Sequence, residues 1–255
     1  MATTFTEGTQ TLATGPKTDV EPRDRGVHVY GHLKDGKGRI ICATEEAGVA
    51  RNRHVHRNQI VVGVGNLIPL WAANVTLYWR FNPTSFNDLP DAKTKIRSLI
   101  STALGDWEDA RPVNFTERDE GWDFEVVLRN AADCDATGCV LASSFFPDAG
   151  RHKLYLYPTM FEQDEDEQVK TLIHEFGHVF GLRHFFAPLS ETDSKSEIFG
   201  TNVKFSIMNY GSDSMLTAAD KADLKTLYVQ ARSGELRAIN GTPIHLMRPF
   251  SSIGS

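Results

Sequence analysis

The segment from His174 to His184 constrains this chain more than any other stretch, because it has the pattern His-Glu-x-x-His-x-x-Gly-x-x-His. In a helix, His174 and His178 lie four residues apart, so both imidazoles project from one face and can reach one ion. Gly181 is the residue type best able to take a left-handed backbone and end the helix. The chain can then bend and bring His184 back as a third ligand. The pattern predicts a helix, a turn and a three-histidine metal site.

The chemistry of this pattern predicts a catalytic zinc ion rather than a structural one. Three nitrogen ligands leave the fourth position of zinc for water. Glu175, next to the first ligand, can act as a general base toward that water. A bare His-Glu-x-x-His match could be an ordinary amphipathic helix, but five fixed positions make coincidence negligible. The remaining histidines lack this spacing and are interpreted as surface or core side chains: His28, His32, His54, His56, His152 and His245.

The composition fits one soluble domain with appended segments. The chain has 255 residues, 40% of them hydrophobic, enough to bury a sizeable core. No apolar run approaches the roughly 20 residues of a membrane-spanning helix, so no membrane span is expected. With 27 Lys and Arg against 33 Asp and Glu, the formal net charge is −6, and no nucleic-acid partner is expected.

The N-terminus lacks the basic and apolar regions of a signal peptide. The compartment and the oligomeric state stay unknown.

The order of the elements favours an α+β fold. Residues 1–26 are rich in Thr, Gly, Pro and charge, which predicts a flexible leader. Residues 27–69 are expected to form a small N-terminal β element of unknown role, with two short strands around a Gly-rich turn. Apolar residues recur with helical spacing from Ile96 to Trp107, in a helix that begins at Pro90. Strands are predicted at residues 76–81, 113–115, 122–128, 140–146 and 153–157. Strands and helices that are segregated in this way are typical of an α+β sheet with helices packed on it.

An acidic run, Glu162 to Glu167, directly precedes the helix that contains the histidines. Negative charge at a helix N-terminus is favourable, so the run predicts the first turn of that helix. A Ca²⁺ site is the alternative interpretation, although the run lacks the spaced ligands and the Gly of a calcium loop.

Cysteine usage is low, with three residues in the chain. Cys134 and Cys139 lie five residues apart with a Gly between them, so a disulfide there is an open alternative in an oxidising compartment. An odd count leaves at least one thiol unpaired within the chain.

With these motifs the chain resembles the metzincin clan of zinc metalloendopeptidases. The clan has a tight turn that holds a Met beneath the metal, and Ser206-Ile207-Met208-Asn209-Tyr210 looks like that Met-turn. A Tyr two residues after the Met is similar to the astacin and serralysin branches. The resemblance implies that Tyr210 stabilises the tetrahedral intermediate, with a plain wall of the specificity pocket as the alternative role.

The resemblance also implies a domain organisation. Residues 70–232 look like a matrixin-like catalytic domain with a metzincin-like zinc-peptidase fold. Its upper subdomain, up to about residue 184, would contain a twisted mixed sheet and the active-site helix. Its smaller lower subdomain, residues 185–232, would contain the Met-turn and a C-terminal helix. Residues 233–255 are expected to be a C-terminal tail.

The function implied by the resemblance is zinc-dependent hydrolysis of peptide bonds, with one catalytic Zn²⁺ and with Glu175 as general base. Protein or peptide substrates would lie extended along the cleft and pair with strand 141–146. The alternatives are a non-catalytic peptide-binding module and a narrow-target effector on the same scaffold. Retention of Glu175 argues against the binding module, because a binder needs no general base.

The N-terminal region and the compartment stay open under this resemblance. Residues 1–66 have no clear family counterpart. Cys42 there could imitate the cysteine switch of latent matrixins, although its flanking residues do not match that motif, or it could be a buried free thiol. The resemblance favours secretion, whereas the missing signal peptide and the few cysteines favour the cytoplasm or unconventional export.

Overall fold

The centre of the fold is a five-stranded mixed sheet with the strand order β10-β11-β7-β5-β6. The computed structural model describes residues 29–32, 39–41, 60–64, 66–86, 90–134, 138–184, 197–200, 206–208 and 214–253. The strands of the sheet are β5 (Thr76–Phe81), β6 (Asn114–Glu117), β7 (Phe124–Leu128), β10 (Ala142–Ser143) and β11 (His152–Leu156). They pair in parallel except for β10, which runs antiparallel to β11 and forms one edge of the sheet.

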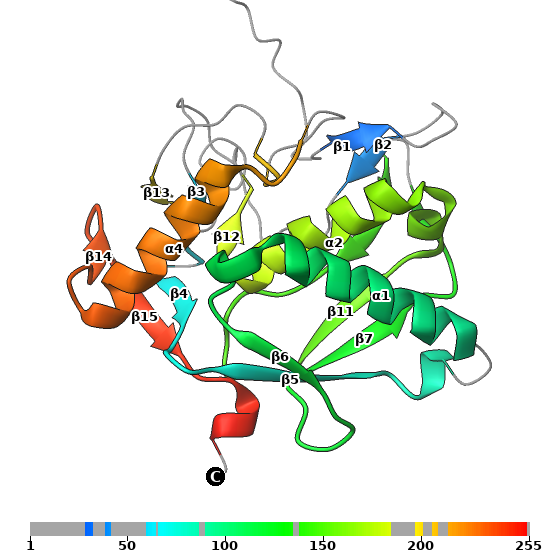
Figure 1. The fold of residues 1–255 in the computed structure, drawn as a ribbon, viewed down its shortest axis with the longest axis horizontal. Coiled ribbons are helices and arrows are strands. Elements are labelled where there is room, and N and C mark those ends of the chain that lie inside the picture. The colour runs from blue at the N-terminus through cyan, green and yellow to red at the C-terminus, as the bar shows by residue number, and fades with distance from the viewer. Residues whose placement is uncertain are drawn as a thin grey trace, which may run out of the picture.

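Helices α1 (Pro90–Asp106) and α2 (Glu165–Val179) lie together over one face of this sheet (Figure 1). The apolar stripe predicted for α1 is buried, as its spacing requires: Ile96, Leu99, Ile100, Ala103, Leu104 and Trp107. Phe115 from the sheet contacts Phe176 and Phe180 from the end of α2 with ring centroids 5.3 and 6.1 Å apart. These contacts place the hydrophobic core between the sheet and the two helices.

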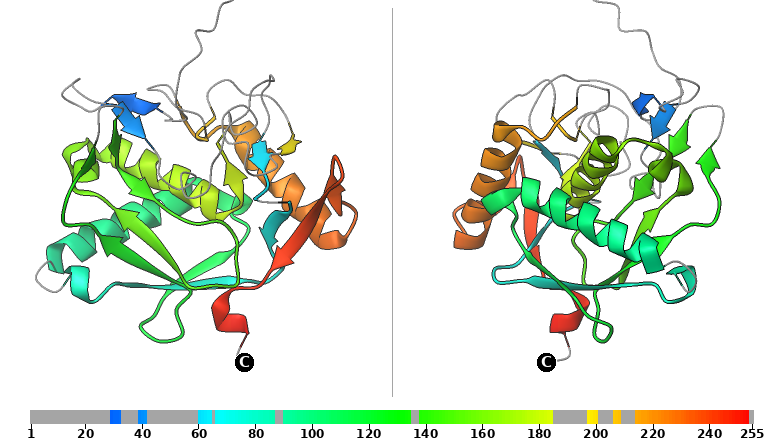
Figure 2. Two further views of the ribbon diagram at one scale, coloured as in Figure 1. Left: turned by 180° about the vertical axis from the view of Figure 1, so that it is seen from behind. Right: turned by 45° about the vertical axis from the view of Figure 1, so that its right-hand side comes forward.

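Two smaller sheets lie beside α4 (Ala218–Ser233), at the other end of the molecule from β10 (Figure 2). One has the order β12-β3-β13, and the other has the order β14-β15-β4. The strands of these two sheets are β3 (Ile60–Val62), β4 (Ile68–Trp71), β12 (Leu182–Arg183), β13 (Glu197–Phe199), β14 (Ala238–Ile239) and β15 (Thr242–Met247). Helix α4 begins with a capping box between Thr217 and Asp220 and ends at Gly234, which has a left-handed backbone.

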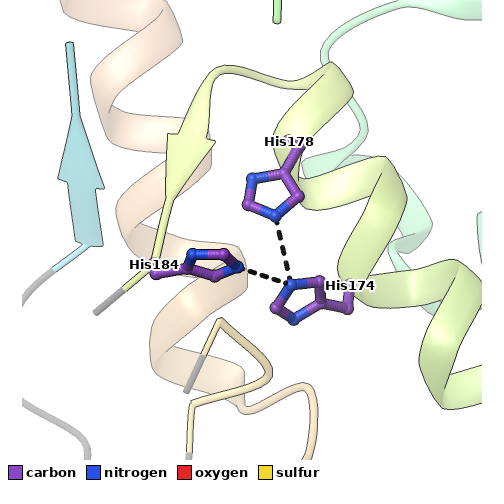
Figure 3. Close-up of side chains that lie close together, drawn as sticks. All are labelled: His174, His178 and His184. Carbon is purple, nitrogen blue, oxygen red and sulfur yellow. Dashed lines mark hydrogen bonds between the residues drawn. The ribbon is translucent and has the colours of Figure 1, made fainter. Parts of the chain in front are cut away.

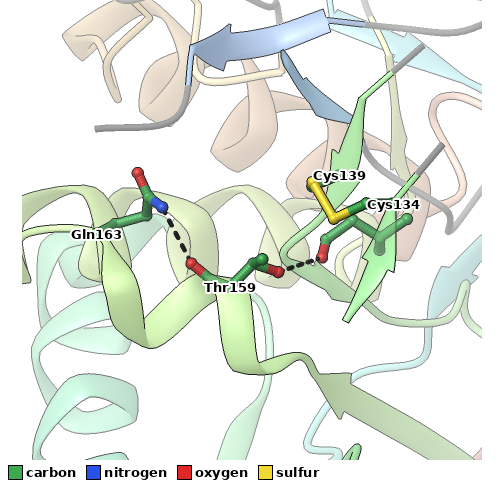
Figure 4. The surroundings of a disulfide bond; sticks show 5 residues. Cys134, Cys139, Thr159 and Gln163 are labelled. Atoms are coloured by element: carbon green, nitrogen blue, oxygen red, sulfur yellow. Dashed lines mark hydrogen bonds between the residues drawn. A yellow bond between two sulfur atoms is a disulfide. The ribbon is translucent and has the colours of Figure 1, made fainter. Parts of the chain in front are cut away.

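A further sheet contains the N-terminal strands, in the order β1-β2-β9-β8. The two short strands predicted there are β1 (Val29–His32) and β2 (Arg39–Ile41). They pair antiparallel, and β2 pairs in parallel with β9 (Cys139–Val140). A disulfide bond joins Cys139 to Cys134 in β8 (Asp133–Cys134), which settles the alternative left open by the sequence (Figure 4). Thr159 donates to the Val140 carbonyl at 3.1 Å next to this disulfide.

The structure differs from two specific predictions made from the sequence. The strand predicted over 140–146 is interrupted at Leu141, whose carbonyl accepts from the Tyr157 N–H at 3.0 Å, so β9 and β10 belong to different sheets. Residues 233–255, predicted as a tail, instead contain β14 and β15, and β15 pairs in parallel with β4. The alternating burial of a short strand beside exposed turns gives too weak a signal to identify such a hairpin from sequence.

The remaining described segments are short 3-10 helices: η1 (Thr84–Phe86), η2 (Glu108–Ala110), η3 (Pro158–Glu162) and η4 (Phe250–Ser252). Among the described residues, every helix is too short or too polar to cross a bilayer. The predicted leader and Cys42 lie outside the described residues. The observed architecture confirms the predicted α+β class, with a twisted mixed sheet and a long helix that contains the first two histidines.

Candidate metal centre

Helix α2 begins within the acidic run, at Glu165, and places two histidines on its buried face. The Asp164 side chain caps the helix by accepting from the Glu167 N–H at 3.0 Å. Lys170 forms ion pairs with Asp166 and Glu167, so these exposed charges also stabilise the first turns. These contacts confirm the helix-start interpretation of the run and leave the calcium alternative untested. Ten residues beyond the cap, the helix turns His174 into the interior.

The chain turns back directly after α2, as the motif predicts. Gly181 has a φ of +89°, and a Cβ atom at this position would lie only 2.8 Å from the Pro69 carbonyl oxygen. Only glycine combines this backbone with such a close approach. Strand β12 follows the turn, and His184 comes immediately after it. The turn therefore brings a third fully buried histidine to the first two.

The three imidazoles converge on one point (Figure 3). The Nε2 atom of His174 lies 3.1 Å from the Nε2 atom of His178 and 3.1 Å from that of His184. All three candidate ligand atoms lie within 4.8 Å of one another. The structure thus brings together every histidine that the sequence predicts as a ligand.

The hydrogen bonds of the other ring nitrogens determine whether these Nε2 atoms can act as metal ligands. Nδ1 of His174 lies 2.8 Å from the Ile207 carbonyl oxygen, and Nδ1 of His178 lies 2.8 Å from the Leu182 carbonyl oxygen. Because a carbonyl can only accept, both Nδ1 atoms donate, and in the neutral rings both Nε2 atoms carry lone pairs. Complete burial lowers the pKa of His174 to about 4 and lowers the pKa of His178 well below its ordinary value.

Facing lone pairs at this distance repel unless they share a cation. Proton sharing is disfavoured by the burial of both rings, whereas a divalent metal satisfies the lone pairs of all three histidines at once. Zinc prefers imidazole nitrogen, and with three such ligands it keeps one position open. The donor set, its tautomers and its burial fit a zinc ion of the catalytic type.

Met208 lies on a short turn that packs against α2. The Met208 N–H donates to the Ser206 hydroxyl at 3.2 Å, and Ile207, between them, supplies the carbonyl that orients His174. A Cβ atom at Gly177 would overlap the Met208 Sδ atom, so α2 and this turn are in very close contact. Residues 206–208 of the predicted Met-turn thus pack against α2 and orient the first ligand through a hydrogen bond.

The structure places one of the two predicted catalytic residues and does not describe the other. Glu175 is almost completely buried beside His174. Its backbone carbonyl accepts from the Ser144 hydroxyl at 2.9 Å, which ties α2 to the segment that follows edge strand β10. Tyr210 lies outside the described residues, so its role stays a prediction.

Two supporting residues were missed by the sequence analysis. The Trp71 indole N–H donates to the Val179 carbonyl at 2.7 Å, and the Tyr228 hydroxyl donates to the Phe180 carbonyl at 3.1 Å. These are end carbonyls of α2, which lack partners inside the helix. The Tyr228 hydroxyl also accepts from the Trp71 backbone N–H at 3.2 Å, and burial raises the pKa of Tyr228, so the hydroxyl keeps its proton. In the sequence both aromatics look like ordinary core residues, and only their polar ends hint at such a role.

Comparison with known proteins gives a family match and several relatives. A model of the matrixin family matches residues 70–229. Stromelysin-3 from Homo sapiens is 33% identical over 106 residues, which cover 35% of this chain and 21% of the relative. Stromelysin-3 from Xenopus laevis is 30% identical over 108 residues, which cover 36% of this chain and 22% of the relative. Matrix metalloproteinase-17 from Homo sapiens is 32% identical over 128 residues, which cover 44% of this chain and 21% of the relative.

The matched segment thus spans about a fifth of the length of these curated relatives. Among solved structures, one titled "Structure of myroilysin" is similar, with a TM-score of 0.44 and 17% sequence identity. That similarity covers 66% of this chain and 98% of the other.

Proposed function

The chain belongs to the matrixin family, and from this premise we propose that it is a zinc-dependent metalloendopeptidase. The observation that carries the proposal is the convergence of three buried Nε2 atoms, from His174, His178 and His184. Backbone carbonyls orient the rings of the first two. A structural zinc site would normally provide a fourth protein ligand, whereas a three-ligand site leaves room for water.

The residues around this centre have distinct proposed roles. When bound, a zinc ion would lower the pKa of a water molecule toward about 7 and polarise the scissile carbonyl. Glu175 would take the proton from the attacking water and then pass it to the leaving amine. Tyr210 would donate a hydrogen bond to the oxyanion that develops on the carbonyl.

The substrate is proposed to be an extended protein or peptide segment. Strand β10 is one of the two edge strands of the five-stranded sheet, and the hydroxyl of Ser144, which follows it, donates to the Glu175 carbonyl. An extended peptide that adds to this edge would run past the metal. Its backbone would form hydrogen bonds with the strand, and its side chains would bind in pockets. This arrangement supports the strand-addition hypothesis made from the sequence.

A secreted or otherwise oxidising location is proposed on separate grounds. The Cys134–Cys139 disulfide is a bond that persists outside reducing compartments. The disulfide therefore supports export over a cytoplasmic location. It agrees with the secretion that the family resemblance implies, and it weighs against the cytoplasmic location suggested by the small number of cysteines.

The test is cleavage of a peptide library by the full chain, with and without a metal chelator. Broad cleavage that the chelator abolishes and added zinc restores would support an endopeptidase. Cleavage of one narrow set would support the effector on the same scaffold. Zinc-dependent retention of peptides without cleavage would support the binding module and contradict the proposed hydrolysis.

The matched variant for this test is Glu175→Gln, which keeps the shape of the side chain and removes the base. We expect it to bind zinc like the wild-type chain and to lose nearly all cleavage. Full activity in this variant would exclude Glu175 as the general base.

A further inference from the structure

Strand β3 lies before the matrixin-matched region, which starts at residue 70, yet it is the central strand of the sheet β12-β3-β13. Val62 pairs with Leu182, and Val61 pairs with Arg183, in an antiparallel arrangement. Leu182 and Arg183 are the whole of β12, and His184 is the next residue. The N-terminal part of the chain therefore contacts the segment that delivers the third histidine (Figure 3).

We propose that β3 is a positioning strand for the metal centre, whose pairing with β12 sets the place of His184. This inference rests on the proposed function, because it assigns a role toward the zinc ion. It also makes residues 60–62 part of the site, although no ligand lies among them.

The first argument is the shortness of β12. A two-residue strand has almost no stability of its own and takes its position from the strands beside it. In the sequence it follows directly from the left-handed turn at Gly181. Strand β12 lies at one edge of its sheet, so β3 is the strand that pairs with it and helps to hold the backbone next to His184.

The second argument is that β12 orients two ligands at once. The Leu182 carbonyl accepts from Nδ1 of His178, and His184 follows one residue after Arg183. A shift of β12 would therefore turn the second imidazole and displace the third. Loss of a hydrogen bond that orients a ligand ring typically lowers metal affinity by about 10-fold to 100-fold.

The third argument is that β3 is itself firmly placed. Val62 is completely buried in the core, and β3 pairs on its other side with β13. In β13, the Glu197 carboxylate accepts from the Asn240 amide at 2.9 Å and from the Thr242 hydroxyl. These residues belong to the β14–β15 hairpin, which is anchored through β15 to β4. The support for β3 is thus separate from the metal-binding helix.

The direct test is Val61→Pro in the full chain. Proline removes the backbone N–H and is not tolerated in a central strand without distortion. Zinc affinity is measured by competition with a chromogenic chelator, and the visible absorption of the cobalt-substituted protein reports ligand geometry. Circular dichroism and urea unfolding of the metal-free chain report the fold. We expect zinc affinity to fall by about tenfold or more and the cobalt spectrum to change, with the fold retained.

The matched control is Ile40→Pro, in another N-terminal strand that precedes the matched region. It disrupts the pairing of β2 with β9, which contains no ligand and adjoins none. Its zinc affinity and cobalt spectrum are expected to equal those of the wild-type chain.

A second variant covers the case in which Val61→Pro does not fold. Val62→Gly weakens the strand and keeps every backbone N–H, and we expect it to bind zinc several-fold more weakly than wild type. Wild-type zinc affinity in a folded Val61→Pro chain, or in Val62→Gly, would overturn the inference while leaving the proposed function intact. A wild-type chain that binds no zinc would instead remove the proposed function, and the inference with it.

Discussion

Nδ1 of His178 lies 2.8 Å from the carbonyl oxygen of Leu182, so the strand that leads to the third ligand also orients the second. A shift of β12 would therefore affect both His178 and His184. The same principle holds for His174, which is oriented by a carbonyl from the Met208 turn. Each helix-borne ligand is thus held by a backbone group from outside the helix, as is usual for metal-binding histidines.

Gly177→Ala is expected to destabilise the protein despite the better helix propensity of alanine. The new Cβ would overlap Sδ of the buried Met208, and overpacking of a core costs about 1–3 kcal/mol. Because this pushes on the turn that orients His174, zinc affinity should fall as well. Urea unfolding and chelator competition measure the two effects.

Gly105→Ala is the matched control for that substitution. Gly105 also lies in a helix, but a Cβ there meets no atom within 4 Å, so alanine should stabilise the protein by about 0.5–1 kcal/mol. In a Met208→Ala background the cost of Gly177→Ala should largely disappear. Equal effects of the two alanine substitutions, or an unchanged cost without Met208, would contradict the close contact.

Tyr228→Phe tests the support at the end of α2. The variant leaves the Phe180 carbonyl and the Trp71 backbone N–H without their hydroxyl partner in a buried place, which costs about 1–3 kcal/mol for each unsatisfied group. We expect a lower free energy of unfolding in urea and weaker zinc binding. Tyr155→Phe in β11 removes a hydroxyl that has no hydrogen bond among the described residues and should change neither quantity. Wild-type stability of Tyr228→Phe would contradict the assigned role.

The stability of the metal-free chain should depend on pH because of the buried histidines. Burial lowers the pKa of His174 to about 4, whereas the unfolded chain takes up the proton near the ordinary value of 6.5. Between these two pH values the unfolded state binds more protons, so stability is complete above 6.5 and falls as pH falls toward 4. The slope is up to about 1.4 kcal/mol per pH unit for each such histidine, and the pKa of His178 is also lowered.

Urea unfolding of the metal-free chain at about pH 7, 6 and 5 measures this effect. Because carboxylates also titrate at acid pH, the matched comparison is the double variant His174→Asn, His178→Asn. Its stability should depend less steeply on pH than that of the wild-type chain in this window. Parallel curves for the two proteins would contradict the pKa shifts.

The parts of the fold that follow from local patterns were predictable from the sequence. The spacing of apolar residues was enough to predict helix α1. The helical period and one glycine were enough to predict that three histidines meet: His174, His178 and His184. In each case the information lies within a few turns of one element, where geometry leaves little choice.

The parts that depend on distant pairing were not predictable in the same way. The pairing of β3 with β12 joins segments about 120 residues apart in the sequence. Neither strand is long enough for its periodicity to indicate which strand it pairs with. The contacts of Trp71 and Tyr228 with the end of α2 likewise depend on where the folded chain brings them. The break at Leu141 and the C-terminal hairpin were missed for the same physical reason.

The zinc content of the purified chain tests the central claim most directly. After dialysis against metal-free buffer near neutral pH, wild type should retain about one zinc ion per chain, whereas His178→Ala should retain almost none, because a catalytic site has only three protein ligands. No zinc in the wild-type chain after loading, or equal zinc in both proteins, would contradict the assignment of His174, His178 and His184 as the metal centre.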